Sequence, residues 1–212
     1  MRRVLFGLAV TAITVLALAG PASAASGQVT QFRFHGPFAE ADWSTSTATS
    51  FTDIYINVSR SKQGPELYVD HFTGHLDAHG NFTGGTDTFA DVTSGFSFTI
   101  DQRKLTIAST SGSGLPATTC SVDANGNPTS CSHTTIGVTA HWTGNGPITR
   151  GVSNDHFKTG GFSVRDHFNG TDRNAAATGA NSGVTLSPAE LQYADLGNTN
   201  SGTVTVCHGT GC

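Results

Sequence analysis

Short β-prone segments separated by turn dipeptides are the feature that most constrains the fold of this chain. Turn signals such as His79-Gly80, Asn125-Gly126 and Asn169-Gly170 recur between them. The segments rich in Val, Ile, Thr, Phe and Tyr are 31–35, 51–58, 66–72, 96–100, 104–107, 135–142 and 202–207. Many short strands joined by such turns are typical of antiparallel folds. We therefore predict an all-β fold, an antiparallel β-sandwich or an irregular β-barrel of roughly eight to eleven strands.

One segment has a helical signal. Ser187-Pro188-Ala189-Glu190 places a capping Ser before a Pro at the first helical position, and a Glu stands three residues after the Ser. The same residues fit a turn that leads into a strand. No alternation of strand and helix patterns occurs, which argues against a parallel nucleotide-binding sheet. We expect at most one short helical turn.

The first 24 residues have the order of a secretory signal peptide. Arg2 and Arg3 precede an apolar run over 5–19, and Pro21-Ala22-Ser23-Ala24 supplies small residues at a cleavage site. No later apolar run approaches the ~20 residues that span a bilayer. We therefore predict a signal peptide over 1–24, a secreted protein without a membrane span, and a single β-rich extracellular domain over 25–212.

Four cysteines in a secreted chain predict two disulfides. Three connectivities are possible. We favour Cys120–Cys131, which would close the turn sequence 123–128, and Cys207–Cys212, which would close a short Gly-containing loop. Zinc sites usually pair cysteines about two to four residues apart, and these spacings differ. We expect no metal site at the cysteines.

The charge balance argues against a nucleic-acid partner. The formal net charge is −4, and only 12% of the residues are charged. Removal of Arg2 and Arg3 with the leader would lower Lys+Arg from 11 to 9 against 15 acids. A protein that neutralises phosphates needs basic patches, and the sequence has none.

His71, His75 and Asp77 are the candidate ligand-binding residues. Alternate residues of a strand share a face, so His71, His75, Asp77 and His79 would lie on one side. At ~3.3 Å per residue, His71 and His75 lie ~13 Å apart, which is too far for two ligands of one zinc. A solvated strand face is the simpler interpretation, and we predict no metal there.

No catalytic residue and no cofactor is predicted. Asp155-His156 and Asp166-His167 flank the turn 159–161, but neighbours on a strand point to opposite faces and cannot form a dyad. Glu40 and Asp42 would share a strand face at ~7 Å between α-carbons, a spacing compatible with paired carboxylates. Nucleophile-elbow, zinc-protease and phosphate-loop motifs do not occur.

Several segments carry a resemblance to small exported proteins of actinobacteria whose function is uncharacterised. They are the Ala-rich leader ending at Ala24, Asn154-Asp155-His156-Phe157, the segment 166–171 and the tail ending in Cys212. The resemblance covers the mature chain and implies no activity, so it transfers no functional residues.

The leading hypothesis is a secreted, non-enzymatic β-rich module that binds an envelope component, a glycan, a small ligand or a protein partner. Its support is a polar, low-charge scaffold without a catalytic signature. A secreted hydrolase or metal-dependent enzyme that uses the His/Asp-rich strand face is the first alternative. The second is a structural or adhesive protein that self-associates through strand edges.

Overall fold

The computed structural model describes residues 28–62, 64–159 and 162–208, and these residues form eleven β-strands and no helix. The strands are β1 (Gln28–Ser46), β2 (Ser50–Ser61), β3 (Gly64–Leu76), β4 (Phe82–Val92), β5 (Phe96–Ile100), β6 (Ile107–Val122), β7 (Pro128–Gly144), β8 (Thr149–Thr159), β9 (Phe162–Asn181), β10 (Val184–Leu186) and β11 (Leu191–His208). The predicted all-β class and strand number are confirmed. The predicted signal peptide 1–24 lies outside the described residues.

The strands belong to one sheet with the order β10-β9-β11-β1-β2-β3-β4-β6-β5. In addition, β7 pairs with β6 and β9, and β8 pairs with β9. Pairs with a defined register are antiparallel. Across the described ranges, no helix is long and apolar enough to cross a bilayer.

The sheet divides into two compact units. The larger unit comprises Gly36–Thr149 and Asp172–Asn198. The smaller unit contains 28–35, 150–159, 162–171 and 199–208 among the described residues. Strands β1, β9 and β11 contribute to both units, and each unit is described by itself below.

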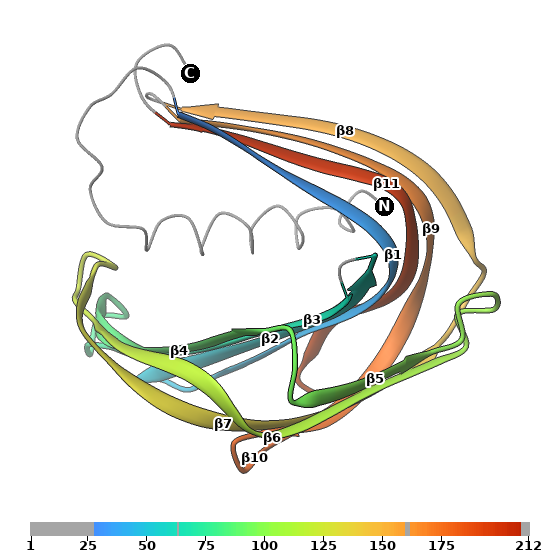
Figure 1. Ribbon diagram of the computed structural model, residues 1–212. Helices are drawn as coiled ribbons and strands as arrows, with labels where there is room; N and C mark the ends of the chain where they lie inside the picture. Colours follow the sequence, from blue (N-terminus) through green and yellow to red (C-terminus); the bar gives the residue numbers. More distant parts are fainter. Residues whose placement is uncertain (1–27, 63, 160–161, 209–212) are drawn as a thin grey trace. The chain divides into compact units, whose positions relative to one another are not determined.

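The larger unit is a β-sandwich. Figure 1 shows β2, β3 and β4 in one layer and β5, β6, β7 and β10 in the facing layer. Strand pairing assigns β1 and β11 to the first layer, because β1 pairs with β2 and β11 pairs with β1. The C-terminal part of β9 pairs with β7 and belongs to the second layer. Pairing of β4 with β6 joins the two layers.

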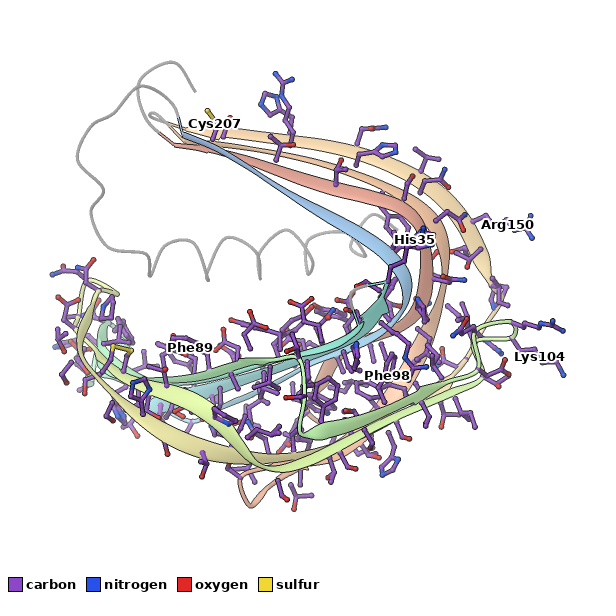
Figure 2. The ribbon with its side chains drawn as sticks, in the orientation of Figure 1. His35, Phe89, Phe98, Lys104, Arg150 and Cys207 are labelled. Atoms are coloured by element: carbon purple, nitrogen blue, oxygen red, sulfur yellow. A yellow bond between two sulfur atoms is a disulfide. The ribbon has the colours of Figure 1, made fainter. Side chains whose placement is uncertain are left out.

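Alternating residues of both layers fill the core of the larger unit. Ala39, Ala41 and Trp43 point inward from β1, and every second residue of β7 from Ile136 to Trp142 does the same. Figure 2 shows the side chains between the layers, including Phe98 of β5. Since full burial of one aliphatic side chain stabilises a fold by about 1.5–3 kcal/mol, this interior is the main source of stability.

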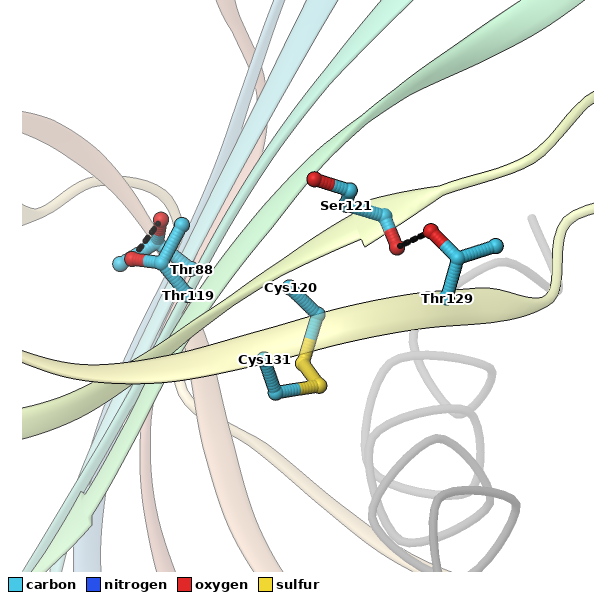
Figure 3. The surroundings of a disulfide bond; sticks show 6 residues. All are labelled: Thr88, Thr119, Cys120, Ser121, Thr129 and Cys131. Atoms are coloured by element: carbon cyan, nitrogen blue, oxygen red, sulfur yellow. Dashed lines mark hydrogen bonds between the residues drawn. A yellow bond between two sulfur atoms is a disulfide. The ribbon is translucent and has the colours of Figure 1, made fainter.

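The predicted Cys120–Cys131 disulfide is present, and it joins directly opposed residues of β6 and β7 (Figure 3). The turn between them is closed by Asp123, whose Oδ1 accepts the N–H groups of Asn125 and Asn127 at 2.9 Å each. Gly126 has a φ of 82°, which favours glycine. Cys212 lies outside the described residues, so the pairing Cys207–Cys212 stays a prediction.

Residues 187–190 form a turn, in agreement with the second interpretation of that segment. The Glu190 N–H donates to the oxygen of Ser187 at 3.1 Å, and β11 begins directly afterwards at Leu191. The turn leads directly into β11, which pairs with β1.

In the smaller unit, β8 and β9 pair across the predicted turn at 159–161. His167 Nδ1 lies 2.7 Å from Asn154 Oδ1. His35 Nδ1 lies 2.7 Å from the main-chain oxygen of Asn200. The side chains of Asp155 and Asp166, which accompany the two histidines in sequence, lie outside the described residues.

Candidate functional site

Eight carboxyl side chains lie on the outer face of the layer β11-β1-β2-β3-β4, which we call the acidic face. They occupy positions that alternate with core residues of the same strands. They are Glu40, Asp42, Asp53, Glu66, Asp70, Asp87, Asp91 and Asp195. Arg60 is the sole Lys or Arg in the part of these strands that belongs to the larger unit, and its guanidinium lies over the Phe98 ring of the other layer.

The three tyrosines of the chain, Tyr55, Tyr68 and Tyr193, lie on the same face. Strand register sets them among the carboxyls, because directly opposed residues on neighbouring strands place their side chains side by side. One row across four strands is Asp42, Tyr55, Asp70 and Phe89. The next row is Glu40, Asn57, Tyr68 and Asp91.

Glu40 is the most buried carboxyl of the face, at 1% exposed. Its Oε2 accepts the Tyr55 hydroxyl at 2.7 Å and the Asn57 Nδ2 at 3.3 Å. Burial raises the pKa of Glu40 and the charge of Asp42 adds to the shift, whereas the two donors oppose it. The Glu40 carboxyl is therefore a fixed acceptor at the base of the face.

Asp195, on β11, is 3% exposed. Burial raises its pKa to about 7, and the charges of Glu40 and Asp172 contribute. Its Oδ1 has no hydrogen-bond partner among the described residues. A buried carboxyl of this kind is costly when ionised, so it exchanges a proton near neutral pH.

Asp70 and Asp87, on β3 and β4, share a hydrogen bond between their carboxyl groups. Burial and the charge of Asp70 raise the pKa of Asp87 to about 7. The Tyr68 hydroxyl donates to Asp70 Oδ2 at 3.1 Å. Asp42 has a pKa of about 6, owing to burial and to the charges of Asp53 and Asp70. The face therefore changes its charge between about pH 6 and 7.

Three phenylalanines extend the acidic face at one end. The ring centroids of Phe51, Phe72 and Phe82 lie 5.6–6.2 Å apart. Phe72 stands directly opposite Asp53 on one side and Asp87 on the other. Apolar ring surface thus adjoins the carboxyls, which is a common composition for a ligand-binding surface.

The sequence candidates His71, His75 and Asp77 lie elsewhere. His71 and His75 are on β3 at positions that alternate with Tyr68 and Asp70, so they belong to the opposite side of the strand. Burial lowers the pKa of His71. Asp77 follows β3 in a turn, where its two oxygens accept bonds from His79 and Asn81. In the described part of the chain, no three His, Cys, Asp or Glu residues form a group that could hold a metal.

Sequence reasoning identified Glu40 and Asp42 as a pair on one strand face but missed the rest of the acidic face. The available signal was a repeated spacing of two residues. It occurs in Asp53 and Tyr55, in Tyr68 and Asp70, and in Tyr193 and Asp195. Strands that repeat the same acidic–aromatic alternation are candidates for one shared face.

Comparisons of the chain with protein-family models, curated proteins and solved structures found no significant match. The chemistry of the acidic face is therefore the basis for assigning a function.

Proposed function

We propose that this protein is a secreted, non-enzymatic binding module whose acidic face takes a protonated amine on a hydroxyl-rich scaffold, as in an amino sugar of an envelope glycan. One observation carries the proposal. All three tyrosines and eight of the fifteen carboxyls share one sheet face without a Lys or Arg among its described residues.

Charge complementarity supports an amine. Asp42, Asp53 and Asp70 are half-buried carboxyls on adjacent strands, and no Lys or Arg lies on this face of those strands within the described residues. A hydrogen bond to a charged group contributes about 1.5–3 kcal/mol. A ligand ammonium would supply the missing positive charge.

The tyrosines and phenylalanines support a scaffold with both hydroxyls and apolar faces. Tyr55 and Tyr68 have ring centroids 6.2 Å apart and present hydroxyls beside carboxyls. Aromatic rings pack against the apolar faces of ligand rings, whereas carboxylates and phenols bond to hydroxyls. The Cys120–Cys131 disulfide and the predicted leader support an extracellular location.

Calorimetric titration with a deacetylated glucosamine oligomer and its N-acetylated counterpart tests the proposal. The free amine should bind and the acetylated oligomer, which lacks the charge, should bind at least about tenfold more weakly. Asp70→Asn should weaken amine binding by a similar factor. Asp123→Asn, which removes a carboxylate from a turn outside the face, is the matched control and should bind as the wild type does.

Affinity should also fall as the pH is lowered from about 6 to about 5, because Asp42 and the remaining ionised fraction of Asp87 become protonated in a range where the sugar amine is already charged. It should fall above neutral pH as well, because the sugar amine then loses its proton. Equal binding of both oligomers, or an unchanged affinity in Asp70→Asn, would contradict the proposal.

The Asp70–Asp87 hydrogen bond favours a secreted hydrolase as the second candidate, since one protonated and one ionised carboxyl form an acid–base pair. Mass spectrometry of the same oligomer mixtures distinguishes the two functions. If the wild type shortens the oligomers and Asp87→Asn does not, the protein is a hydrolase rather than a binding module. If the oligomers stay intact, the result supports binding alone.

A further inference from the structure

The outer face of the second layer of the larger unit has the opposite chemistry, and we call it the hydroxyl face. Its twelve positions are the outward residues of five neighbouring strands. They are Ser97 and Thr99 of β5, Ile107, Ser109 and Ser111 of β6, Thr139, His141 and Thr143 of β7, Ala176, Thr178 and Ala180 of β9, and Thr185 of β10. Ser109 and Ala180 are half-buried, and the other ten are exposed.

Register aligns these side chains in straight rows across the strands. The longest row runs through Ser97, Ser111, Thr139, Ala180 and Thr185. The row beside it runs through Thr99, Ser109, His141 and Thr178. Because strands lie about 4.8 Å apart, the longest row spans about 19 Å.

Four of the hydroxyls of this face are held by hydrogen bonds to one another. Ser97 Oγ lies 2.9 Å from Ser111 Oγ, and Thr99 Oγ1 lies 2.8 Å from Ser109 Oγ. The Thr99–Ser109 pair uses one proton internally and keeps a second proton and free lone pairs for a ligand. In the other pair, Ser97 Oγ also donates to the Ser111 main-chain oxygen at 3.4 Å, so this pair offers mainly its lone pairs. Short side chains in fixed positions also lose little entropy on binding.

None of the twelve positions holds Lys, Arg, Asp or Glu. Eight carboxyls of this unit lie on the outer face of the other layer instead. A partner that carried charge would therefore find no opposite charge here, and its desolvation would not be offset. The composition favours a neutral partner that is itself rich in hydroxyls.

A second copy of the chain is a poorer fit to this face. Stable protein–protein interfaces have cores enriched in aromatic residues and depleted in Ser. The hydroxyl face has no aromatic ring apart from His141, and its one large exposed apolar side chain is Ile107, at 62% exposed.

We infer that the hydroxyl face binds a linear, neutral polysaccharide that lies along the rows, perpendicular to the strands. A single hydrogen bond between neutral groups contributes only about 0.5–1.5 kcal/mol. A polymer that repeats its hydroxyls engages several row positions at once, and the linked contacts add avidity. This inference does not depend on the amine site, because the two faces belong to different layers and share no residue.

Co-sedimentation with insoluble cellulose, and affinity electrophoresis in soluble neutral glucan and mannan, test the inference. The wild-type protein should bind at least one of these polymers. Thr139→Glu and Thr139→Lys place opposite charges at the centre of the longest row, so both should reduce binding at least about fivefold. Thr139→Val keeps the shape but removes the hydroxyl, and it should reduce binding less.

Thr93→Glu, at an exposed position between β4 and β5, is the matched control and should bind as the wild type does. Asp70→Asn should also leave neutral-polymer binding intact, which separates this face from the acidic one. Thermal melts establish that each variant folds. Absence of binding to every neutral polymer, or binding that neither charged variant reduces, would overturn the inference. A dimer in sedimentation velocity that Thr139→Glu dissociates would instead assign the face to a second copy.

Discussion

The indole Nε1 of Trp142, on β7, donates a 2.9 Å hydrogen bond to the main-chain oxygen of Glu40, on β1. Trp142 and Glu40 are 102 residues apart in sequence, and the bond crosses the core from one layer to the other. The side chain of Glu40 extends to the other side of β1, where it accepts the Tyr55 hydroxyl. A single residue thus connects the core to the acidic face.

Trp142→Phe should lower the free energy of unfolding more than Trp43→Phe does. Both rings are buried, but Trp43 Nε1 has no partner among the described residues, whereas replacement of Trp142 removes a buried hydrogen bond to the Glu40 oxygen. The expected difference is about 1–3 kcal/mol. Urea denaturation of both variants measures it, and equal losses would mean that the hydrogen bond contributes nothing.

The free energy of unfolding should fall as the pH rises from about 4 to about 7, and then level off. Asp42, Asp87 and Asp195 have folded pKa values of about 6, 7 and 7. Aspartates in an unfolded chain titrate near 4, so the folded state holds more protons in this range. The contribution of these three aspartates to the free energy of unfolding is complete below about pH 4. It is lost as the pH rises through their folded pKa values.

His71 acts in the opposite direction, because its lowered pKa removes stability as the pH falls below about 6.5. Asp195→Asn isolates one acidic contribution. Urea melts at about pH 5 and pH 8 should show a smaller decrease with pH in this variant, and higher stability than the wild type at pH 8. An identical pH dependence in the two proteins would show that Asp195 does not take part.

Replacing both Cys120 and Cys131 by Ser should lower the free energy of unfolding by about 2–3 kcal/mol. The disulfide closes a loop with a sequence separation of 11, which restricts the unfolded chain. Thermal melts under oxidising conditions measure the loss. The Asp123 turn should survive, because its hydrogen bonds do not involve the cysteines. A variant as stable as the wild type would contradict a stabilising role.

The hairpin β3–β4 repeats the turn sequence of β6–β7, with Asp77-Ala78-His79-Gly80-Asn81 matching Asp123-Ala124-Asn125-Gly126-Asn127. Counted from the turns, the opposed pair Gly74–Gly85 occupies the place of the disulfide. There the Phe51 ring covers Gly74, and a Cβ on Gly74 would lie 2.3 Å from Phe51 Cε1. Two similar hairpins are thus reinforced by different means.

Gly74→Ala should therefore destabilise the protein, and Phe51→Leu should reduce that effect. The added methyl group displaces a ring that packs on Phe72 and Phe82, and overpacking of this kind costs about 1–3 kcal/mol. A double-mutant cycle by urea denaturation measures the coupling. Additive losses from the two substitutions would show that the ring does not limit position 74.

Local sequence patterns predicted parts of β1, β2, β3, β5, β7 and β11 and the hairpin around 123–128, because turn chemistry and alternation act over a few residues. The predicted segment 104–107 is wrong except at its end, since residues 102–104 form a turn and β6 begins at Ile107. The same logic failed for the faces of β3. The expected polar side contained His71 and His75, with Phe72 on an apolar side. In the structure Phe72 lies with Tyr68 and Asp70, while the core is reached by Leu67 and Val69. Alternation defines two faces but does not state which one is buried.

The amino-acid sequence by itself predicted the all-β class, several turn positions and the shared face of Glu40 and Asp42, and it favoured the Cys120–Cys131 pairing among three connectivities. Each depends on residues close together in the chain. Only the tertiary structure decided that Asp195, Glu40, Tyr55, Asp70 and Asp87 meet on one face. These residues come from five strands, and their meeting depends on strand order, register and choice of buried side, which are settled by burial of the whole core rather than by any local pattern.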